Sequence, residues 1–195
     1  MAMIFDTLSA RLDDSALSQL TTRLGANEGT TSKAIAAAVP LLLGALARNS
    51  SNPGGAEQLH QALVRDHDGR VLDQPTGIPD DQRLADGQAI LGHILGDRRS
   101  VAEQGISQAS GLDVSKVGPL LTMLAPLVMG ALGRARAQRN LDPQGLAQLL
   151  GQEREDLGAR APGILGALSR MLDRDKDGSP LDDISGMLGG LFGRR

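Results

Sequence analysis

The strongest candidate for chemistry is an acidic loop near the end of the chain. Aspartates alternate at positions 173, 175 and 177 and are followed by Gly178, which is the D-x-D-x-D-G opening of a calcium-binding loop. Carboxylates at alternate positions can converge on one oxygen-lined cavity, and glycine permits the sharp turn. The sequence therefore predicts a Ca²⁺ site with the candidate ligands Asp173, Asp175, Asp177, Ser179, Asp182 and Asp183.

This loop departs from a complete calcium loop at its twelfth position. Ile184 stands where a bidentate glutamate is expected, so Asp182 or Asp183 would have to replace it, as in shorter dockerin-like loops. The simpler interpretation is that the aspartates cap helix ends and that Asp177-Gly178 makes a turn. Calcium is therefore the one cofactor that the sequence suggests, and none is certain.

Other patterns of catalysis and metal binding are lacking in the sequence. Cysteine is absent, which excludes disulfides, thiolate nucleophiles and zinc–thiolate sites. The three histidines, His60, His67 and His93, fall in different predicted elements and form no H-E-x-x-H pair. No G-x-S-x-G elbow or Walker loop occurs. Because no acid, base and nucleophile can be named together, the sequence favours a protein that is not an enzyme.

Charge and aromatic content argue against nucleic-acid binding. The net charge is −3, and aromatic residues make up 1% of the chain, so neither a basic surface nor stacking platforms are expected. Arg134, Arg136 and Arg139 form one basic cluster at the end of an apolar segment. We favour a helix-dipole role for this cluster over contact with phosphate or anionic lipid.

An internal repeat indicates how the elements that carry these residues are organised. Pro40–Arg48 reads PLLLGALAR and Pro126–Arg134 reads PLVMGALGR, at an offset of 86 residues (126 − 40). The acidic turn recurs too, since Arg65–Asp73 resembles Arg174–Asp182, although Val64 and His67 weaken the first turn as a metal site. The sequence therefore predicts two tandem copies: residues 1–99, with a degenerate acidic turn, and residues 100–195, with the D-x-D-x-D-G loop.

The predicted fold class is all-α, a duplicated helical bundle with no sheet, because no segment alternates with period two. The expected helices span residues 1–12, 15–24, 34–48, 56–64, 82–96, 100–111, 113–136, 144–153, 163–172 and 181–195.

Residues typical of helix ends set the boundaries of these helices. Thr31 or Ser32 is the expected cap of helix 34–48, and Ser100 with Glu103 has the spacing of a capping box. Aspartate caps are expected at Asp13 or Asp14, at Asp113 and at Asp142, and glycine stops at Gly25 and Gly111.

Small residues in the two apolar segments predict close helix packing. Both copies have a glycine four residues after the proline, so we expect the repeated segments to pack together or against equivalent segments of another chain. The candidate interaction residues are Pro40, Gly44, Ala45, Pro126, Gly130 and Ala131.

The second apolar segment raises the question of a membrane. Val117–Gly133 carries no charge over seventeen residues (133 − 117 + 1), which is the lower edge of a span. Its two prolines and three glycines favour a buried helix over a membrane span. The N-terminus lacks a basic region followed by a long apolar run, so we expect a cytoplasmic protein.

The stretch Leu17–Leu46 resembles the bacterial YidB-like family, a helical domain of unknown function. The shared pattern is a leucine-spaced helix, a Leu-Gly stop, a short polar loop and an Ala/Leu helix interrupted by proline. Leu24, Gly25, Ser32, Ala36, Pro40 and Leu46 carry it in the first half, and Gly111, Asp113, Ser115, Pro126 and Leu132 in the second. The resemblance implies an all-α fold and no catalytic residues.

The expected function is self-association, as a homo-oligomer, or binding of a protein partner. The alternative is a calcium-binding or membrane-surface-responsive module. A calcium-dependent shift in the melting temperature, or co-sedimentation with liposomes, would favour the alternative.

Overall fold

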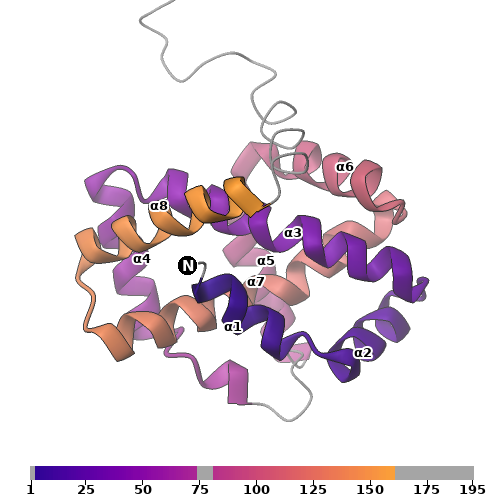
Figure 1. The fold of residues 1–195 in the computed structure, drawn as a ribbon, viewed down its shortest axis with the longest axis horizontal. Helices are drawn as coiled ribbons and strands as arrows, with labels where there is room; N and C mark the ends of the chain where they lie inside the picture. Colours follow the sequence, from indigo (N-terminus) through magenta and orange to yellow (C-terminus); the bar gives the residue numbers. More distant parts are fainter. Residues whose placement is uncertain (1–2, 74–80, 161–195) are drawn as a thin grey trace, which may run out of the picture.

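The structure is a computed structural model that describes residues 3–73 and 81–160, and all its regular elements are helical (Figure 1). The prediction of an all-α fold is confirmed for this part of the chain. The elements are α1 (Met3–Arg11), α2 (Asp14–Leu24), α3 (Glu28–Asn49), α4 (Pro53–Arg65), η1 (Arg70–Asp73), α5 (Asp81–Leu95), η2 (Gly96–Arg98), α6 (Arg99–Ser110), α7 (Val114–Arg139) and α8 (Pro143–Arg160).

The two apolar segments form the long helices α3 and α7, which lie in the middle of the molecule (Figure 1). Every residue from Leu120 to Gly133 is buried, because neighbouring helices surround α7 on all sides. A helix that is apolar all round is stable in water only when it is covered in this way. Helices α5, α1 and α6 pack on α7, while α6 and α8 pack on α3.

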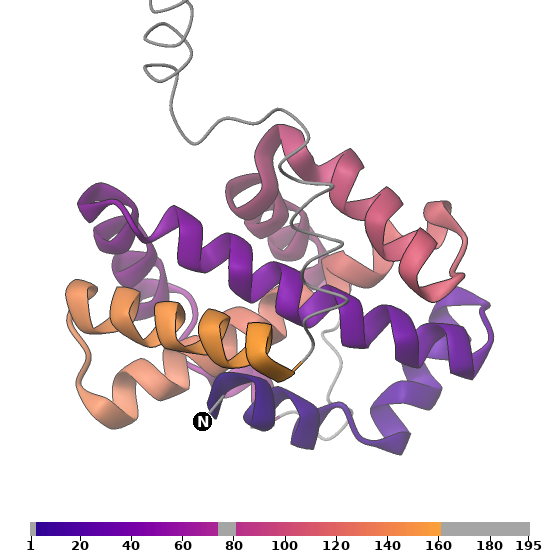
Figure 2. The ribbon, with the colours of Figure 1, turned by 45° about the horizontal axis from the view of Figure 1, so that its top comes forward.

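Helices from both predicted copies contribute to one hydrophobic core. The core cluster runs from Ile4 in α1 to Leu157 in α8. Figure 2 shows α8 running alongside α3, so a helix from beyond residue 99 covers a helix from before it. The boundary expected after residue 99 therefore falls in the first turn of α6 and does not separate two cores.

Several helix ends were predicted correctly from local sequence. Asp13 accepts a hydrogen bond from the Ala16 amide (2.9 Å), and Asp142 accepts one from the Gly145 amide (2.7 Å). Asp113 does the same for the Ser115 amide (2.8 Å). The glycine stops have the left-handed backbone of helix C-caps, with φ of +55° at Gly25 and +75° at Gly111.

The predicted start of α3 was wrong. The helix begins at Glu28, where the Asn27 side chain caps it by accepting from the Gly29 amide (2.8 Å). Thr31 is buried inside the first turn, and its hydroxyl donates to the Asn27 carbonyl (2.9 Å). Asparagine is as good a cap as serine or threonine, so composition alone did not choose between these positions.

The capping box predicted at Ser100 was also wrong. Helix α6 begins one residue earlier, at Arg99, because the 3₁₀-helix η2 runs directly into it. The Glu103 carboxylate instead accepts from the Arg99 Nε atom at 2.8 Å, one turn away. The Glu103 carboxylate, which a capping box would have placed on the Ser100 amide, thus forms an ion pair with Arg99.

Helices α3 and α7 are long and apolar enough to cross a membrane by length and composition alone. Their most apolar windows are, however, 67% and 78% buried within this chain. Core helices commonly pass the same test, so it is weak support for a membrane location.

Candidate functional site

The six residues predicted to bind calcium, Asp173, Asp175, Asp177, Ser179, Asp182 and Asp183, lie outside the described residues, as does the predicted helix 163–172. The related turn of the first half, residues 65–73, is described and shows how such a sequence can fold. It follows α4 directly and leads into η1.

The carboxylates of this first turn are paired with arginines. Asp66 accepts from the Arg65 Nε atom (2.9 Å), and this hydrogen bond holds the pKa of Asp66 below its ordinary value. Asp68 accepts from the backbone amide of Arg70 (3.1 Å) and pairs with the Arg70 side chain (2.6 Å). The amide is the main cause of the lowered pKa of Asp68. Within residues 3–73 and 81–160, no three histidine or carboxylate side chains are grouped to hold a metal ion.

A small cavity lies beneath the turn. It has a volume of about 30 Å³ and is lined by Asp66, His67, Asp68, Gly69, Val71, Asp86 and Pro126. This volume holds about one or two water molecules, which is far below the size of most ligand pockets. The acidic residues around it therefore do not form a substrate site of ordinary size.

Of the six predicted interaction residues, Pro126, Gly130 and Ala131 are buried inside the single chain. A Cβ at Gly130 would lie 2.3 Å from the Val71 Cγ1 atom, so Gly130 contacts η1 and not its counterpart on α3. Helices α3 and α7, which carry the repeated segments, do contact each other, but the neighbour of Gly130 is η1. As a surface for another chain, these three residues are not accessible.

The α3 members of the set differ from those of α7. Pro40 and Ala45 are buried, but Gly44 is partly exposed. Apart from its chain neighbours and the nearby backbone of α3 itself, no atom of the described residues comes within 4 Å of a Cβ placed at Gly44. The same local sequence thus lies in two different surroundings.

Two closer backbone contacts were missed in the sequence. A Cβ at Gly133 would be 1.7 Å from the His67 carbonyl oxygen, and one at Gly87 would be 2.1 Å from the Thr122 carbonyl oxygen. Both distances are far inside van der Waals contact, so neither site can hold a side chain without a shift of backbone. A glycine in the interior of a helix was the available signal. Glycine lowers the stability of a helix relative to alanine, so its presence there indicates a position where a neighbouring backbone leaves no room for a side chain.

Glu153 is a further residue that sequence reasoning missed. It is 1% exposed, and its carboxylate accepts from the backbone amides of Ile4 (2.8 Å) and Phe5 (3.3 Å). These amides belong to the first turn of α1, which has no helical acceptor of its own. Glu153 therefore joins α1 to α8 and serves as the N-terminal cap of α1. A buried glutamate gives no local signal, because its partners are distant in sequence.

Arg134, in the basic cluster at the end of α7, has a structural role within the chain. The Arg134 Nη2 atom donates to the Gly69 carbonyl (2.9 Å) and to the Asp73 carboxylate (2.7 Å). Arg134 thereby holds both ends of the segment 69–73 against α7. Contact of this cluster with phosphate or anionic lipid stays an alternative prediction of the sequence.

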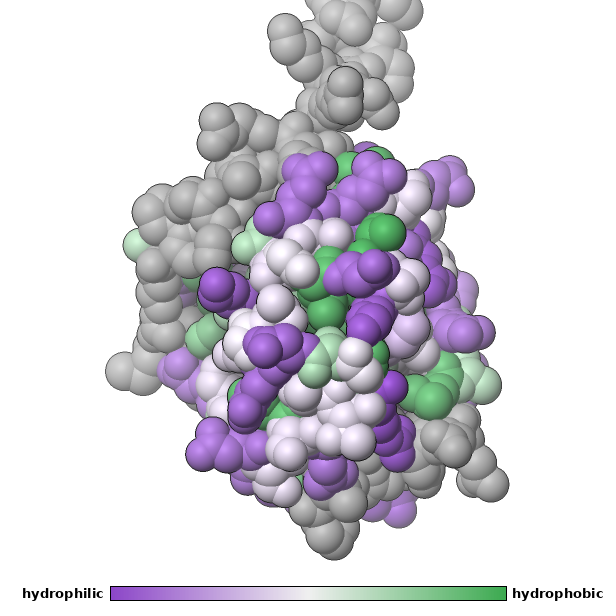
Figure 3. Space-filling model, turned by 90° about the vertical axis from the view of Figure 1, so that its right-hand side faces the viewer, coloured by the Kyte–Doolittle hydropathy of each residue, from purple (hydrophilic) through white to green (hydrophobic). Residues whose placement is uncertain are grey.

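A groove of about 770 Å³ opens between the end of α3, α4 and α5. Apolar side chains contribute to its lining: Leu46, Leu59, Ala62, Ala89, Ile90, Ile94 and Met129. Gly55 and several polar and charged residues complete it, namely Asn49, Ser50, Gln58, Gln61, Arg65, Asp66, His67, Asp86 and His93. The face of the molecule in Figure 3 is mostly hydrophilic or neutral, with small hydrophobic areas.

The comparison with family models places these elements in a known family. Residues 6–135, from α1 into the last turns of α7, match the model of bacterial proteins of unknown function called DUF937. The chain belongs to the DUF937 family. The expected likeness to YidB-like proteins is therefore confirmed at the level of the family. Neither the curated proteins nor the solved structures gave a match.

The DUF937 match spans the boundary at residue 99 as one continuous region. It includes the Gly87 contact with Thr122 and the segment 65–73 with its α7 partners, Gly130, Gly133 and Arg134. Glu153 lies beyond it. The glycine contacts thus belong to the family region of the chain.

Proposed function

We propose that this DUF937 protein is a non-enzymatic module that binds protein segments in the groove between α3, α4 and α5. The observation that carries the proposal is the groove itself, whose lining combines apolar side chains with hydrogen-bonding side chains. Grooves of this kind accept the apolar face of an amphipathic helix, with polar groups flanking it. The bound helix belongs to a second copy of the chain or to a different protein.

The roles of the buried hydroxyl groups support a non-enzymatic function. Ser50, Ser110 and Thr122 each donate to the carbonyl four residues earlier, at 2.8, 2.6 and 2.9 Å. Such bonds satisfy the hydroxyl within its own helix. A serine or threonine nucleophile instead needs an adjacent base, and these hydroxyls are committed to backbone carbonyls.

We also propose that the chain is built from two tandem copies of one helical unit. Asn27 and Asp113, 86 residues apart, cap α3 and α7, and Gly25 and Gly111 end the helices before them. The packing supports the same scheme. Helix α3 contacts α6 and α8 of the second half, while α7 contacts α2 and α4 of the first.

The groove is tested by filling it at Ala89, an exposed lining residue of α5. Ala89→Arg places a long charged side chain in the groove, and Ala85→Arg, one turn away and also exposed, is the matched control. Exposed helical substitutions of this kind change stability by only about 0.5 kcal/mol. We expect light scattering to show a mass that rises with concentration for the wild type and Ala85→Arg, but not for Ala89→Arg.

Binding to a different protein is tested with a photoreactive amino acid at the same two positions in the native bacterium. We expect the photoreactive residue at position 89 to crosslink a defined protein. Leu59→Arg, on the opposite wall of the groove, should abolish this crosslink. If the wild type stays monomeric and position 89 captures no more protein than position 85, the groove is not a binding site.

A further inference from the structure

The segment 67–73 lies on α7 in a way that depends on two glycines. Gly69 has a φ of +96°, and a Cβ there would be 2.9 Å from the Arg134 Cβ and 3.1 Å from the Gly130 carbonyl oxygen. Val71 and Leu72 follow, and both are buried. The turn therefore crosses α7 between Gly130 and Arg134, with Val71 over the space that Gly130 leaves.

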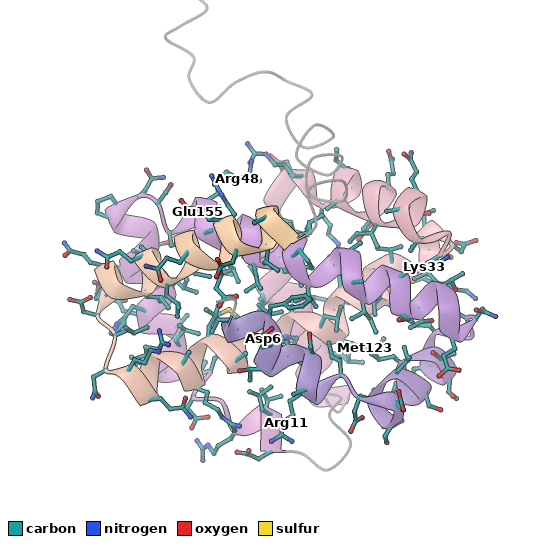
Figure 4. All side chains as sticks on the ribbon, in the orientation of Figure 1. Asp6, Arg11, Lys33, Arg48, Met123 and Glu155 are labelled. Carbon is teal, nitrogen blue, oxygen red and sulfur yellow. The ribbon has the colours of Figure 1, made fainter. Side chains whose placement is uncertain are left out.

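Helix α3 carries the same three positions 86 residues earlier. Gly44 corresponds to Gly130, Ala45 to Ala131 and Arg48 to Arg134. Within the described residues, the space over Gly44 is open to at least 4 Å from a Cβ, whereas Gly130 is covered by Val71. Figure 4 shows Arg48 at the periphery of the molecule.

A segment that matches the occupant of the α7 site occurs once more in the chain. Arg174–Asp182 reads RDKDGSPLD, and Arg65–Asp73 reads RDHDGRVLD, so six of nine residues are identical. The identical residues include Gly178, at the position of Gly69, and Asp182, at the position of Asp73. The likeness continues upstream at the same spacing, where Pro162-Gly163 matches Pro53-Gly54, at the first turn of α4.

The path of the chain makes this segment a neighbour of α3. The last described helix, α8, packs along α3 and ends at Arg160 (Figure 2). Residues 161–173 lie between that end and Arg174. Thirteen residues (173 − 161 + 1) span about 20 Å as a helix and about 40 Å when extended. The extended length exceeds that of α3, a helix of 22 residues that is about 33 Å long.

We propose that residues 174–182 dock on α3 of the same chain over Gly44, as residues 65–73 dock on α7 over Gly130. Arg48 then donates to the Gly178 carbonyl and to the Asp182 carboxylate. Leu181 takes the place that Leu72 holds in the first half. The inference does not depend on the groove between α3, α4 and α5, because it concerns a different face of α3.

A difference between the site on α3 and the site on α7 limits how closely the docked segment can approach α3. Ala47 stands on α3 where α7 has Gly133, and a Cβ at Gly133 would be 1.7 Å from the His67 carbonyl. Residue Lys176, at the position of His67, must therefore sit farther from α3 than His67 does from α7. The docked segment is held mainly at its Gly178 and Asp182 end.

The absence of cysteine allows a direct test by disulfide trapping in the full chain. In the first half, Val71 contacts the space over Gly130, so the equivalent pair is Gly44→Cys with Pro180→Cys. A disulfide requires Cβ atoms within about 4.5 Å. The control pair is Gly92→Cys with Pro180→Cys, since Gly92 is also an open helical glycine. We expect intramolecular crosslinking of the first pair to be about tenfold faster or more, because docking raises the effective concentration.

The pair of charges provides a second readout that loss of folding would not imitate. Arg48→Asp should slow trapping of the Gly44→Cys, Pro180→Cys pair, and adding Asp182→Arg should restore it, since the two groups are coupled only if they meet. Crosslinking at the rate of the Gly92 control overturns the proposal. So does a product that is mainly a crosslinked dimer, because the segment then docks on another copy.

Discussion

Gly87 of α5 lies directly against the main-chain carbonyl oxygen of Thr122 in α7. A Cβ at Gly87 would be 2.1 Å from that oxygen and 3.1 Å from the carbonyl carbon. Pro126 has no N–H, so the Thr122 carbonyl lacks the donor that a helix normally supplies four residues later. Close contact from a glycine Cα to such an oxygen is weakly favourable. The proline of α7 and the glycine of α5 thus act together, although they lie in different helices.

We predict that Gly87→Ala destabilises the protein by about 1–3 kcal/mol, because its methyl group overlaps a backbone atom that cannot rotate away. The matched control is Gly92→Ala on the same helix, where a Cβ meets no described atom within 4 Å. The control should stabilise the protein by about 0.5–1 kcal/mol through helix propensity. Urea unfolding measures both. Stabilisation of both variants would show that the contact with Thr122 is not tight.

Loss of the Glu153 carboxylate should release α1. Glu153→Ala leaves the amides of Ile4 and Phe5 without their acceptor, which costs about 1–3 kcal/mol for a buried donor. Glu153→Gln keeps one acceptor oxygen and should cost less. Glu155→Ala, at the exposed neighbour shown in Figure 4, should be nearly neutral. Hydrogen exchange at Ile4 and Phe5 should accelerate in Glu153→Ala alone, and equal exchange in all variants would exclude a capping role.

The Asp113 cap should make stability depend on pH. Hydrogen bonds from the Ser115 side chain and amide lower the pKa of Asp113 in the folded state. Its contribution is therefore complete above the pKa of the unfolded carboxyl, about 3.9, and is lost as pH falls through the lower folded value. Asp113→Asn keeps the acceptor without titrating. We expect the melting temperature of the wild type to exceed that of Asp113→Asn at neutral pH, and the gap to narrow as the pH falls through the lowered folded pKa of Asp113. A gap that is constant with pH would contradict the charge contribution.

Calcium binding by the loop at Asp173–Asp183 stays a prediction of the sequence. A binding loop should give a saturable heat in calorimetry with CaCl₂ that disappears in Asp177→Ala. Asp68→Ala is the matched control, because Asp68 is occupied by the amide and side chain of Arg70. Identical heats for the wild type and Asp177→Ala would assign the aspartates to turn and cap roles.

Local signals predicted the helices well because they act over a few residues. Asp113 and Asp142 cap amides two and three residues away, and Gly111 ends α6 through its own backbone angle. Where two local solutions were equally good, the prediction failed. Asn27 caps α3 in place of Thr31 or Ser32, and Arg99 takes the carboxylate of Glu103.

The candidate site was harder to predict, since the partners of its residues are distant along the chain. Glu153 and Ile4 are separated by 149 residues, and Arg134 and Gly69 by 65. The groove draws its lining from α3, α4 and α5, whose relative positions no periodicity determines. The repeated glycines indicated close contact, but they did not indicate with what.

The amino-acid sequence by itself determined that the chain is helical, where most of its helices end and that its central segments are buried, because these follow from hydrogen bonds and apolar spacing within a few residues. Only the tertiary structure decided which equivalent residues of the two repeats have different surroundings. Gly44 and Gly130 share the sequence Gly-Ala-Leu, yet Val71 covers one and no described residue covers the other. The reason is physical: steric contact depends on what a distant part of the chain places beside a residue.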